Sequence, residues 1–87
     1  MKIKENFALR QVAGTWVVLP LSEATLNLNG MLTLNETGVF LWNLLEKGST
    51  REDLATALTD EYEVSFEEAL TDVDAYLARL NQIGCLE

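Results

Sequence analysis

The strongest constraint on the fold is a change of hydrophobic period at residues 34–38, which read Leu-Asn-Glu-Thr-Gly. Before this point leucines alternate with other residues, which is typical of a β-strand with one buried face; they are Leu26, Leu28, Leu32 and Leu34. After it apolar residues recur at helical spacing; they are Phe40, Leu41, Leu44 and Leu45. Asn35 is placed to cap that helix, since its side-chain oxygen can accept a free amide of the first turn. The sequence therefore predicts a strand, a tight corner and a helix in direct succession.

Two runs rich in β-branched and aromatic residues precede this corner. Residues 7–12 and 15–20 flank a short glycine-containing turn, a pattern that is typical of an antiparallel hairpin. Pro20 lacks an amide donor, so it should end the second strand or lie on an edge. We expect the third strand within Ala24–Leu34, and the sequence leaves open whether that segment contains a bulge or a turn.

Three helices are expected in the second half of the chain. The first should cover about Glu36–Glu46, with Gly48 just beyond its end. Thr50 and Ser65 are placed to cap the second and third helices, and Gly84 should close the third. We therefore predict a single α+β domain over residues 1–87, with a three-stranded antiparallel sheet followed by three helices in a winged helix-turn-helix-like arrangement.

The residue inventory argues against an enzyme. The chain has no histidine, which removes the commonest general base and metal ligand. Cys85 is the only cysteine, so no internal disulfide can form, and we expect it to be a small buried residue rather than a reactive thiol. We therefore expect no catalytic residue, no metal site and no cofactor.

The distribution of charge argues against nucleic-acid binding. The first 45 residues are neutral, so the net charge of −8 lies entirely in the second half of the chain. A recognition helix should present cations to phosphates, whereas the expected third helix sets Arg79 alone against four acids, Glu67, Glu68, Asp72 and Asp74. We interpret these acids as solvated surface rather than as a metal or acid-base site.

Nothing in the sequence predicts a membrane protein. No segment approaches the roughly 20 apolar residues that a membrane span needs. The basic start of the chain is not followed by the apolar run of a signal peptide. We therefore expect a cytoplasmic protein.

The third strand is the element most open to a partner. An exposed edge of a small sheet can pair with an extended peptide, whose alternate side chains then enter an adjoining apolar groove. The same edge could instead be blunted by twist or a bulge, or be used for dimerisation. The residues alone leave these interpretations balanced.

Several segments resemble one protein family, the PqqD-like proteins (coenzyme PQQ synthesis protein D), which share their domain type with the precursor-peptide recognition elements of ribosomally synthesised modified peptides. The resemblance spans nearly the whole chain. It is carried by Leu34–Gly38, Leu41–Leu45, Thr50–Leu54, Tyr62–Val64 and the C-terminal pattern Asp72-Val73, Tyr76-Leu77, Leu80 and Gly84–Leu86.

The resemblance implies a noncatalytic peptide-binding chaperone. Such a protein captures the leader of a precursor peptide by β-strand addition to the third strand and presents it to a modifying enzyme, often a radical SAM enzyme. Mapped onto this sequence, the expected peptide-binding residues are Leu26, Leu28, Met31, Leu32, Thr33, Leu34, Leu70, Val73, Tyr76, Leu77 and Leu80. Some of those on the third helix must belong to the core instead. The alternative is a degenerate winged-helix module for protein interaction or homodimerisation, without DNA binding.

Overall fold

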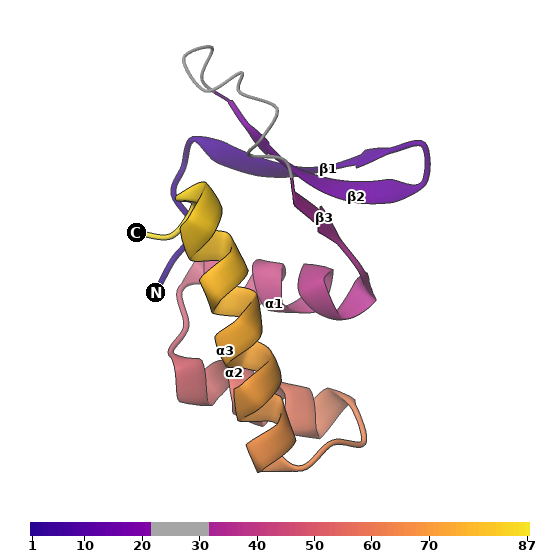
Figure 1. Ribbon diagram of the computed structural model, residues 1–87, viewed down its shortest axis with the longest axis vertical. Helices are drawn as coiled ribbons and strands as arrows, with labels where there is room; N and C mark the ends of the chain where they lie inside the picture. The colour runs from indigo at the N-terminus through magenta and orange to yellow at the C-terminus, as the bar shows by residue number, and fades with distance from the viewer. Residues whose placement is uncertain (22–31) are drawn as a thin grey trace.

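Three antiparallel strands followed by three helices make up residues 1–21 and 32–87, which are the residues that the computed structural model describes (Figure 1). The elements are β1 (Phe7–Val12), β2 (Thr15–Pro20), β3 (Leu32–Leu34), α1 (Glu36–Lys47), α2 (Arg51–Glu61) and α3 (Phe66–Ile83). This is the predicted α+β order. The expected start of the third strand, with Leu26, Leu28 and Met31, lies outside the described residues.

The first two strands form the predicted hairpin. They pair in register from Phe7 opposite Pro20 to Val12 opposite Thr15. Both turn residues, Ala13 and Gly14, have positive φ angles of 52° and 81°, the geometry that matches the twist of a two-residue hairpin. The second strand ends at Pro20 as expected.

The sheet has the order β1-β2-β3, so β3 lies at one edge and β1 at the other. β3 pairs with β2 through Leu32 opposite Val18 and Leu34 opposite Trp16. Within the described part of the chain, no strand pairs with the other side of β3. The strand that the sequence singled out therefore has an unpaired edge there.

Side-chain caps start all three helices at the predicted positions. Asn35 accepts a hydrogen bond from the amide of Gly38 at 2.9 Å. Thr50 and Ser65 each accept one at 3.1 Å from the amide three residues later. Gly84 ends α3 with a left-handed φ of 73°, which a residue without a Cβ adopts easily.

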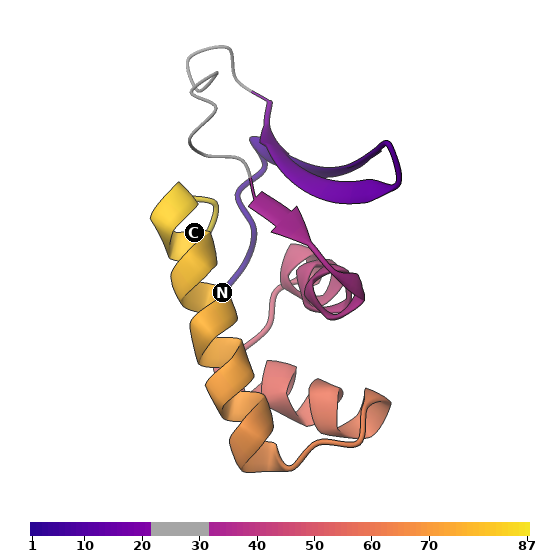
Figure 2. The ribbon, with the colours of Figure 1, turned by 45° about the vertical axis from the view of Figure 1, so that its right-hand side comes forward.

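The core lies where α3 covers the other two helices and the sheet meets α1. Figures 1 and 2 show α3 running along the length of the molecule, beside α2 at one end and beside the sheet at the other. Trp42 is fully buried, whereas Phe40 is half-buried and packs edge-on against Tyr62 with ring centroids 5.9 Å apart. The two aromatic residues therefore do not share the centre of the core, since residues two apart on a helix point to different sides.

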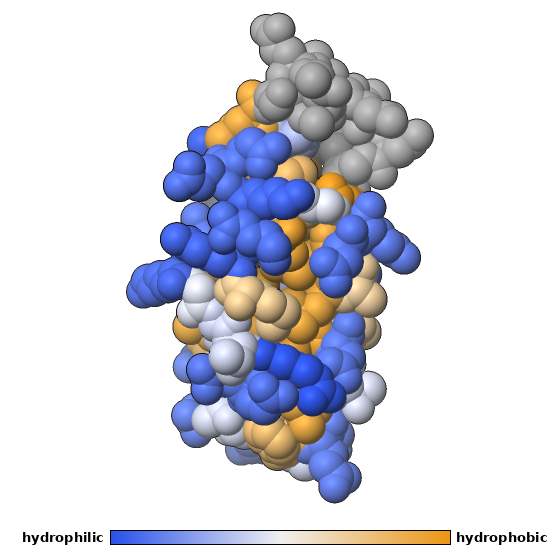
Figure 3. Space-filling view, turned by 90° about the vertical axis from the view of Figure 1, so that its left-hand side faces the viewer, coloured by the Kyte–Doolittle hydropathy of each residue, from blue (hydrophilic) through white to orange (hydrophobic). Residues whose placement is uncertain are grey.

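Hydrophobic residues also reach the surface. On the face shown in Figure 3 they gather along the centre of the molecule, with hydrophilic residues on both sides. None of the helices in residues 1–21 and 32–87 combines the length and the apolar composition of a membrane span.

Candidate functional site: a groove between β3 and α3

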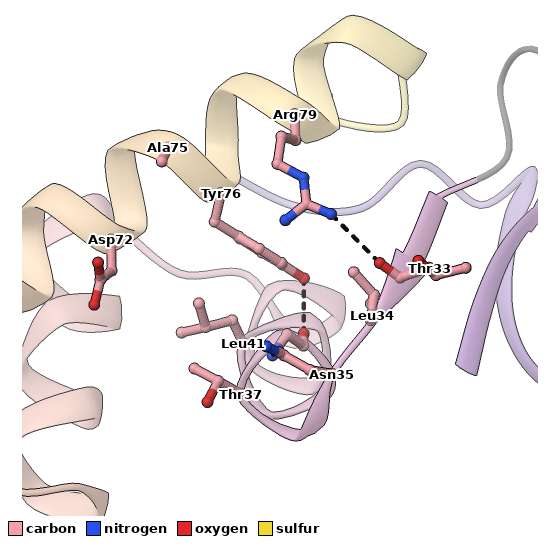
Figure 4. Close-up of a pocket in the computed structure, with 10 residues that line it drawn as sticks. Thr33, Leu34, Asn35, Thr37, Leu41, Asp72, Ala75, Tyr76 and Arg79 are labelled. Carbon is pink, nitrogen blue, oxygen red and sulfur yellow. Dashed lines mark hydrogen bonds between the residues drawn. The ribbon is translucent and has the colours of Figure 1, made fainter. Parts of the chain in front are cut away.

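A groove of about 570 Å³ lies between the open edge of β3 and one face of α3, with the start of α1 beneath it (Figure 4). It is lined by Thr33, Leu34, Asn35, Thr37, Gly38, Leu41, Asp72, Ala75, Tyr76 and Arg79. The lining therefore joins the Leu-Asn-Glu-Thr-Gly corner to a stretch of α3 more than thirty residues later.

The backbone of β3 faces this groove at Thr33. The carbonyl oxygen of Thr33 accepts a long hydrogen bond of 3.4 Å from the guanidinium of Arg79 on α3, so it points away from β2. In an antiparallel pair, the amide and the carbonyl of one residue point to the same side of the strand. The amide of Thr33 therefore also faces the groove and is available to a further strand.

The floor of the groove is apolar and firmly held. Leu34, Leu41 and Tyr76 are all less than a tenth exposed. The hydroxyl of Tyr76 donates a buried hydrogen bond of 2.8 Å to the carbonyl of Gly38 in α1. The hydroxyl is a neutral donor near pH 7, as in any tyrosine, and burial raises the pKa of Tyr76 further above its ordinary value. This bond ties α3 to the first turn of α1.

Gly38 allows that close approach. A Cβ at this position would lie 3.1 Å from the Cβ of Leu34 and 3.2 Å from its Cδ2, which is tighter than ordinary van der Waals contact. The glycine of the corner motif thus lets α1 start directly against β3.

The α3 face of the groove carries charge at both ends. Asp72, Ala75, Tyr76 and Arg79 recur at helical spacing and form one stripe. Figure 4 shows Arg79 beside β3 at one end of the groove and Asp72 at the other. Two small or aromatic side chains separate the charges, so the groove is polar at its ends and apolar in the middle.

The neighbouring acid Asp74 lies outside this stripe. Its two carboxylate oxygens accept hydrogen bonds of 2.5 and 2.8 Å from the guanidinium of Arg51 at the start of α2. This contact holds the pKa of Asp74 below its usual range. Asp74 therefore braces α2 against α3, whereas Asp72 has its side chain at the groove.

The structure brings only some of the expected peptide-binding residues to the groove. Thr33, Leu34 and Tyr76 line it. Leu32 and Leu70 are half-buried and pack against the core. Three others lie in the core beneath α3 and not in the groove lining, namely Val73, Leu77 and Leu80. The residues of α3 that face the core and those that line the groove therefore form two adjacent stripes along the helix, and Tyr76 belongs to both.

Sequence reasoning missed the polar part of the groove. From the sequence, Asp72 and Arg79 were expected only to be surface charges, and no role was expected for Ala75. A signal was nonetheless present, because positions 72, 75, 76 and 79 have the spacing of one helical face that includes Tyr76. Which of the two faces next to Tyr76 would meet β3 depends on how α3 packs.

A second hollow of about 440 Å³ lies by the other edge strand, between β1 and α1. It is lined by residues 7–10 of β1 together with Trp16, Val39, Asn43 and Glu46. The two sheet edges are thus the sites to compare for binding of an extended chain.

No group of three or more His, Cys, Asp or Glu side chains within residues 1–21 and 32–87 is arranged to hold a metal ion.

Two solved structures resemble this fold over nearly its full length. One is TbiB1 in complex with the TbiA(beta) leader peptide, with a TM-score of 0.78 and 26% identity, covering 100% of this chain and 95% of that one. Another is lasso peptide synthetase B1 complexed with the leader peptide, with a TM-score of 0.75 and 25% identity, covering 97% and 93% of the two chains. No curated protein matches this chain in sequence.

The family comparison covers the strand edge, the corner and all three helices. The family model for coenzyme PQQ synthesis protein D matches residues 15–86, from the start of β2 almost to the end of the chain. The match thus includes every residue that lines the groove between β3 and α3. The chain belongs to the coenzyme PQQ synthesis protein D (PqqD) family.

Proposed function

We propose that this protein is a noncatalytic chaperone that captures the leader segment of a ribosomally synthesised precursor peptide. The observation that carries the proposal is the edge of β3 that pairs with no strand within residues 1–21 and 32–87 and lies beside an apolar-floored groove. Two proteins of similar fold are solved in complex with leader peptides, which supports the same class of ligand here. Family membership supports it independently.

Capture would occur by β-strand addition. The leader would pair with the outward amide and carbonyl of Thr33, displacing the long hydrogen bond from Arg79. Side chains on one face of the added strand would then rest on the floor formed by Leu34, Leu41 and Tyr76. Backbone pairing would supply affinity, and the floor would select which side chains fit.

The captured leader would be presented to a peptide-modifying enzyme. The resemblance that the sequence carries favours a radical SAM enzyme as that partner. The protein itself would contribute no chemistry, since it has no histidine and burial raises the pKa of its single thiol to about 11.

An amide-resolved NMR titration tests this function. The ligand is the leader of a short peptide encoded beside this protein. We expect saturable shifts of Thr33 and its neighbours in β3, and of α3 from Asp72 to Arg79. The β1 residues 7–10, which line the other hollow, serve as the internal control and should shift little.

Three outcomes would contradict the proposal in different ways. Shifts centred on β1 would move strand addition to the other edge of the sheet. A dimer in diffusion measurements, with β3 sealed and no response to the leader, would favour the dimerisation module instead. A monomer that binds no leader would contradict leader capture.

A further inference from the structure

We propose that the groove selects leader segments in which a basic residue is followed, two or four positions later, by an acidic residue. Asp72 would pair with the basic side chain and Arg79 with the acidic one. The inference rests on the proposed function and adds a substrate class to it. It comes from the two charges at the ends of the groove and from the direction of β3.

Arg79 occupies the place that an added strand needs. In the free protein its guanidinium donates to the carbonyl of Thr33 at 3.4 Å, which is long for a hydrogen bond, and the side chain is exposed. Strand addition would take that carbonyl and leave the guanidinium without its acceptor. An acidic side chain on the leader would supply a new acceptor at the same place, with the geometry that suits a guanidinium.

The spacing of the two charges sets the spacing in the leader. Asp72 and Arg79 are seven residues apart on α3, which corresponds to about 10 Å along the helix axis. A strand rises about 3.3 Å per residue, and residues on one face of it are two or four apart, or roughly 7 and 13 Å. Long charged side chains span the difference, so both spacings fit.

The direction of β3 sets the order of the charges. β3 runs from Thr33, which lies beside Arg79 in the groove, toward Asn35 and the start of α1 (Figure 4). An antiparallel partner, which pairs slightly more stably than a parallel one, would run from the Asp72 end to the Arg79 end. The basic residue would therefore come first in the leader.

A selection from random peptides tests this inference without a known leader. The full 87-residue protein is used to select from a phage-displayed library of random dodecapeptides. In parallel, the library is selected on Arg79→Gln, on Asp72→Asn and on two control variants, Arg51→Gln and Asp74→Asn. The controls remove one charge of each sign from the α2–α3 contact instead of the groove. Circular dichroism checks that every variant is folded.

The acidic preference is the sharper signal, because a protein with a net charge of −8 attracts basic peptides in general. We expect the wild-type protein and both controls to enrich peptides with the basic-before-acidic order. Arg79→Gln should lose the acidic preference alone, and Asp72→Asn should lose the positioned basic one. For a selected peptide, each groove variant should weaken binding about two- to five-fold, the range of exposed ion pairs.

The remaining outcomes contradict the inference. Enriched peptides that bind at β3 but show no charge preference would overturn the selection rule and leave strand capture standing. A preference for the reverse order would overturn the antiparallel arrangement. A library from which nothing is enriched would count against peptide capture itself, and so against the proposed function as well.

Discussion

Thr33 lies where β3 meets the groove, and its backbone rather than its side chain is what an added strand would use. The side chain is exposed, and the carbonyl faces α3. In Tyr76 it is the side chain that matters: its ring lies in the floor of the groove, and its hydroxyl donates a hydrogen bond to α1. At this scale, the proposed recognition would use backbone atoms of Thr33, whereas the side chain of Tyr76 stabilises the fold.

Replacing Thr33 by proline should abolish leader binding while the protein stays folded. Proline removes the amide of Thr33, which points away from β2 like the carbonyl of the same residue, and it favours extended backbone for the preceding Leu32, which already lies in a strand. Thr33→Ala, which keeps the amide, is the matched control and should bind as the wild type does. Fluorescence anisotropy with a labelled leader measures both. Equal binding by the folded proline variant would show that this amide is not used.

The positions of the helices along the chain are set mainly by interactions at their ends. Each helix starts at a side-chain cap, and α1 starts directly after β3 because Asn35 caps it and Gly38 lies close to Leu34. α2 and α3 are further linked by the contact between Arg51 and Asp74. These local interactions decide where α1 and α3 begin along the chain, but they do not decide which face of α3 meets β3.

Replacing Asn35 by alanine should lower the free energy of unfolding by about 0.5–2 kcal/mol, because the amide of Gly38 loses its acceptor. Asn35→Asp retains a cap oxygen and a charge that suits the helix start, so it should keep most of that stability. Urea denaturation of the three proteins compares them. If the alanine and aspartate variants were equally stable, the cap would not be the source of the stability.

The contact of Asp74 with Arg51 should make stability depend on acid. The pKa of Asp74 in the folded protein lies below its ordinary value of 3.8, so the contact stabilises the fold above that value and is lost as the pH falls through the lowered pKa. The wild type should therefore exceed Asp74→Asn in stability at about pH 6, and the difference should shrink below about pH 4. Because the pair is exposed, the difference should be small and should decrease with added salt.

Denaturation at several pH values measures this difference. Asp72→Asn is the control, since its carboxylate is at the groove and not at the α2–α3 contact. A difference between wild type and Asp74→Asn that stays constant down to about pH 2 would show that the carboxylate charge is not responsible.

Backbone hydrogen bonds join the first residues of the chain to its last residues, and these bonds form a terminal closure of the molecule. The amide of Lys4 donates to the carbonyl of Cys85 at 2.8 Å, and the amide of Glu87 donates to the carbonyl of Lys2 at 2.9 Å. Ile3 also donates to Leu45 in α1 at 3.2 Å. Cys85 lies fully buried beneath this terminal closure, so the accessibility of its thiol shows whether the molecule as a whole has opened.

The Cys85 thiol should react with a thiol reagent only when the molecule opens. Burial raises its pKa to about 11, so little thiolate is present at about pH 8, and the sulfur atom is inaccessible as well. Labelling with Ellman's reagent should be slow in the native protein and fast in concentrated denaturant. Fast labelling under native conditions would show that the terminal closure opens on its own.

Local chemistry determined most of the fold. The hairpin follows from two β-rich runs around a turn in which both residues take positive φ. The helix starts at Asn35, Thr50 and Ser65 follow from side chains that accept amides a few residues away. These interactions act within one turn of the chain, so their residues can be recognised without knowledge of the rest of the molecule.

The tertiary structure alone decided which residues make the groove. Leu80 and Val73 have the same apolar spacing on α3 as a binding face would, yet the packing of α3 on the rest of the molecule buries them. Arg79, an isolated surface charge in the sequence, meets the carbonyl of Thr33 across 46 positions of the chain. Periodicity shows that a helix has an apolar face and a polar face, but it does not show which residues at their boundary meet another element. That depends on the angle at which α3 crosses the sheet and α1, which is set by the whole core at once.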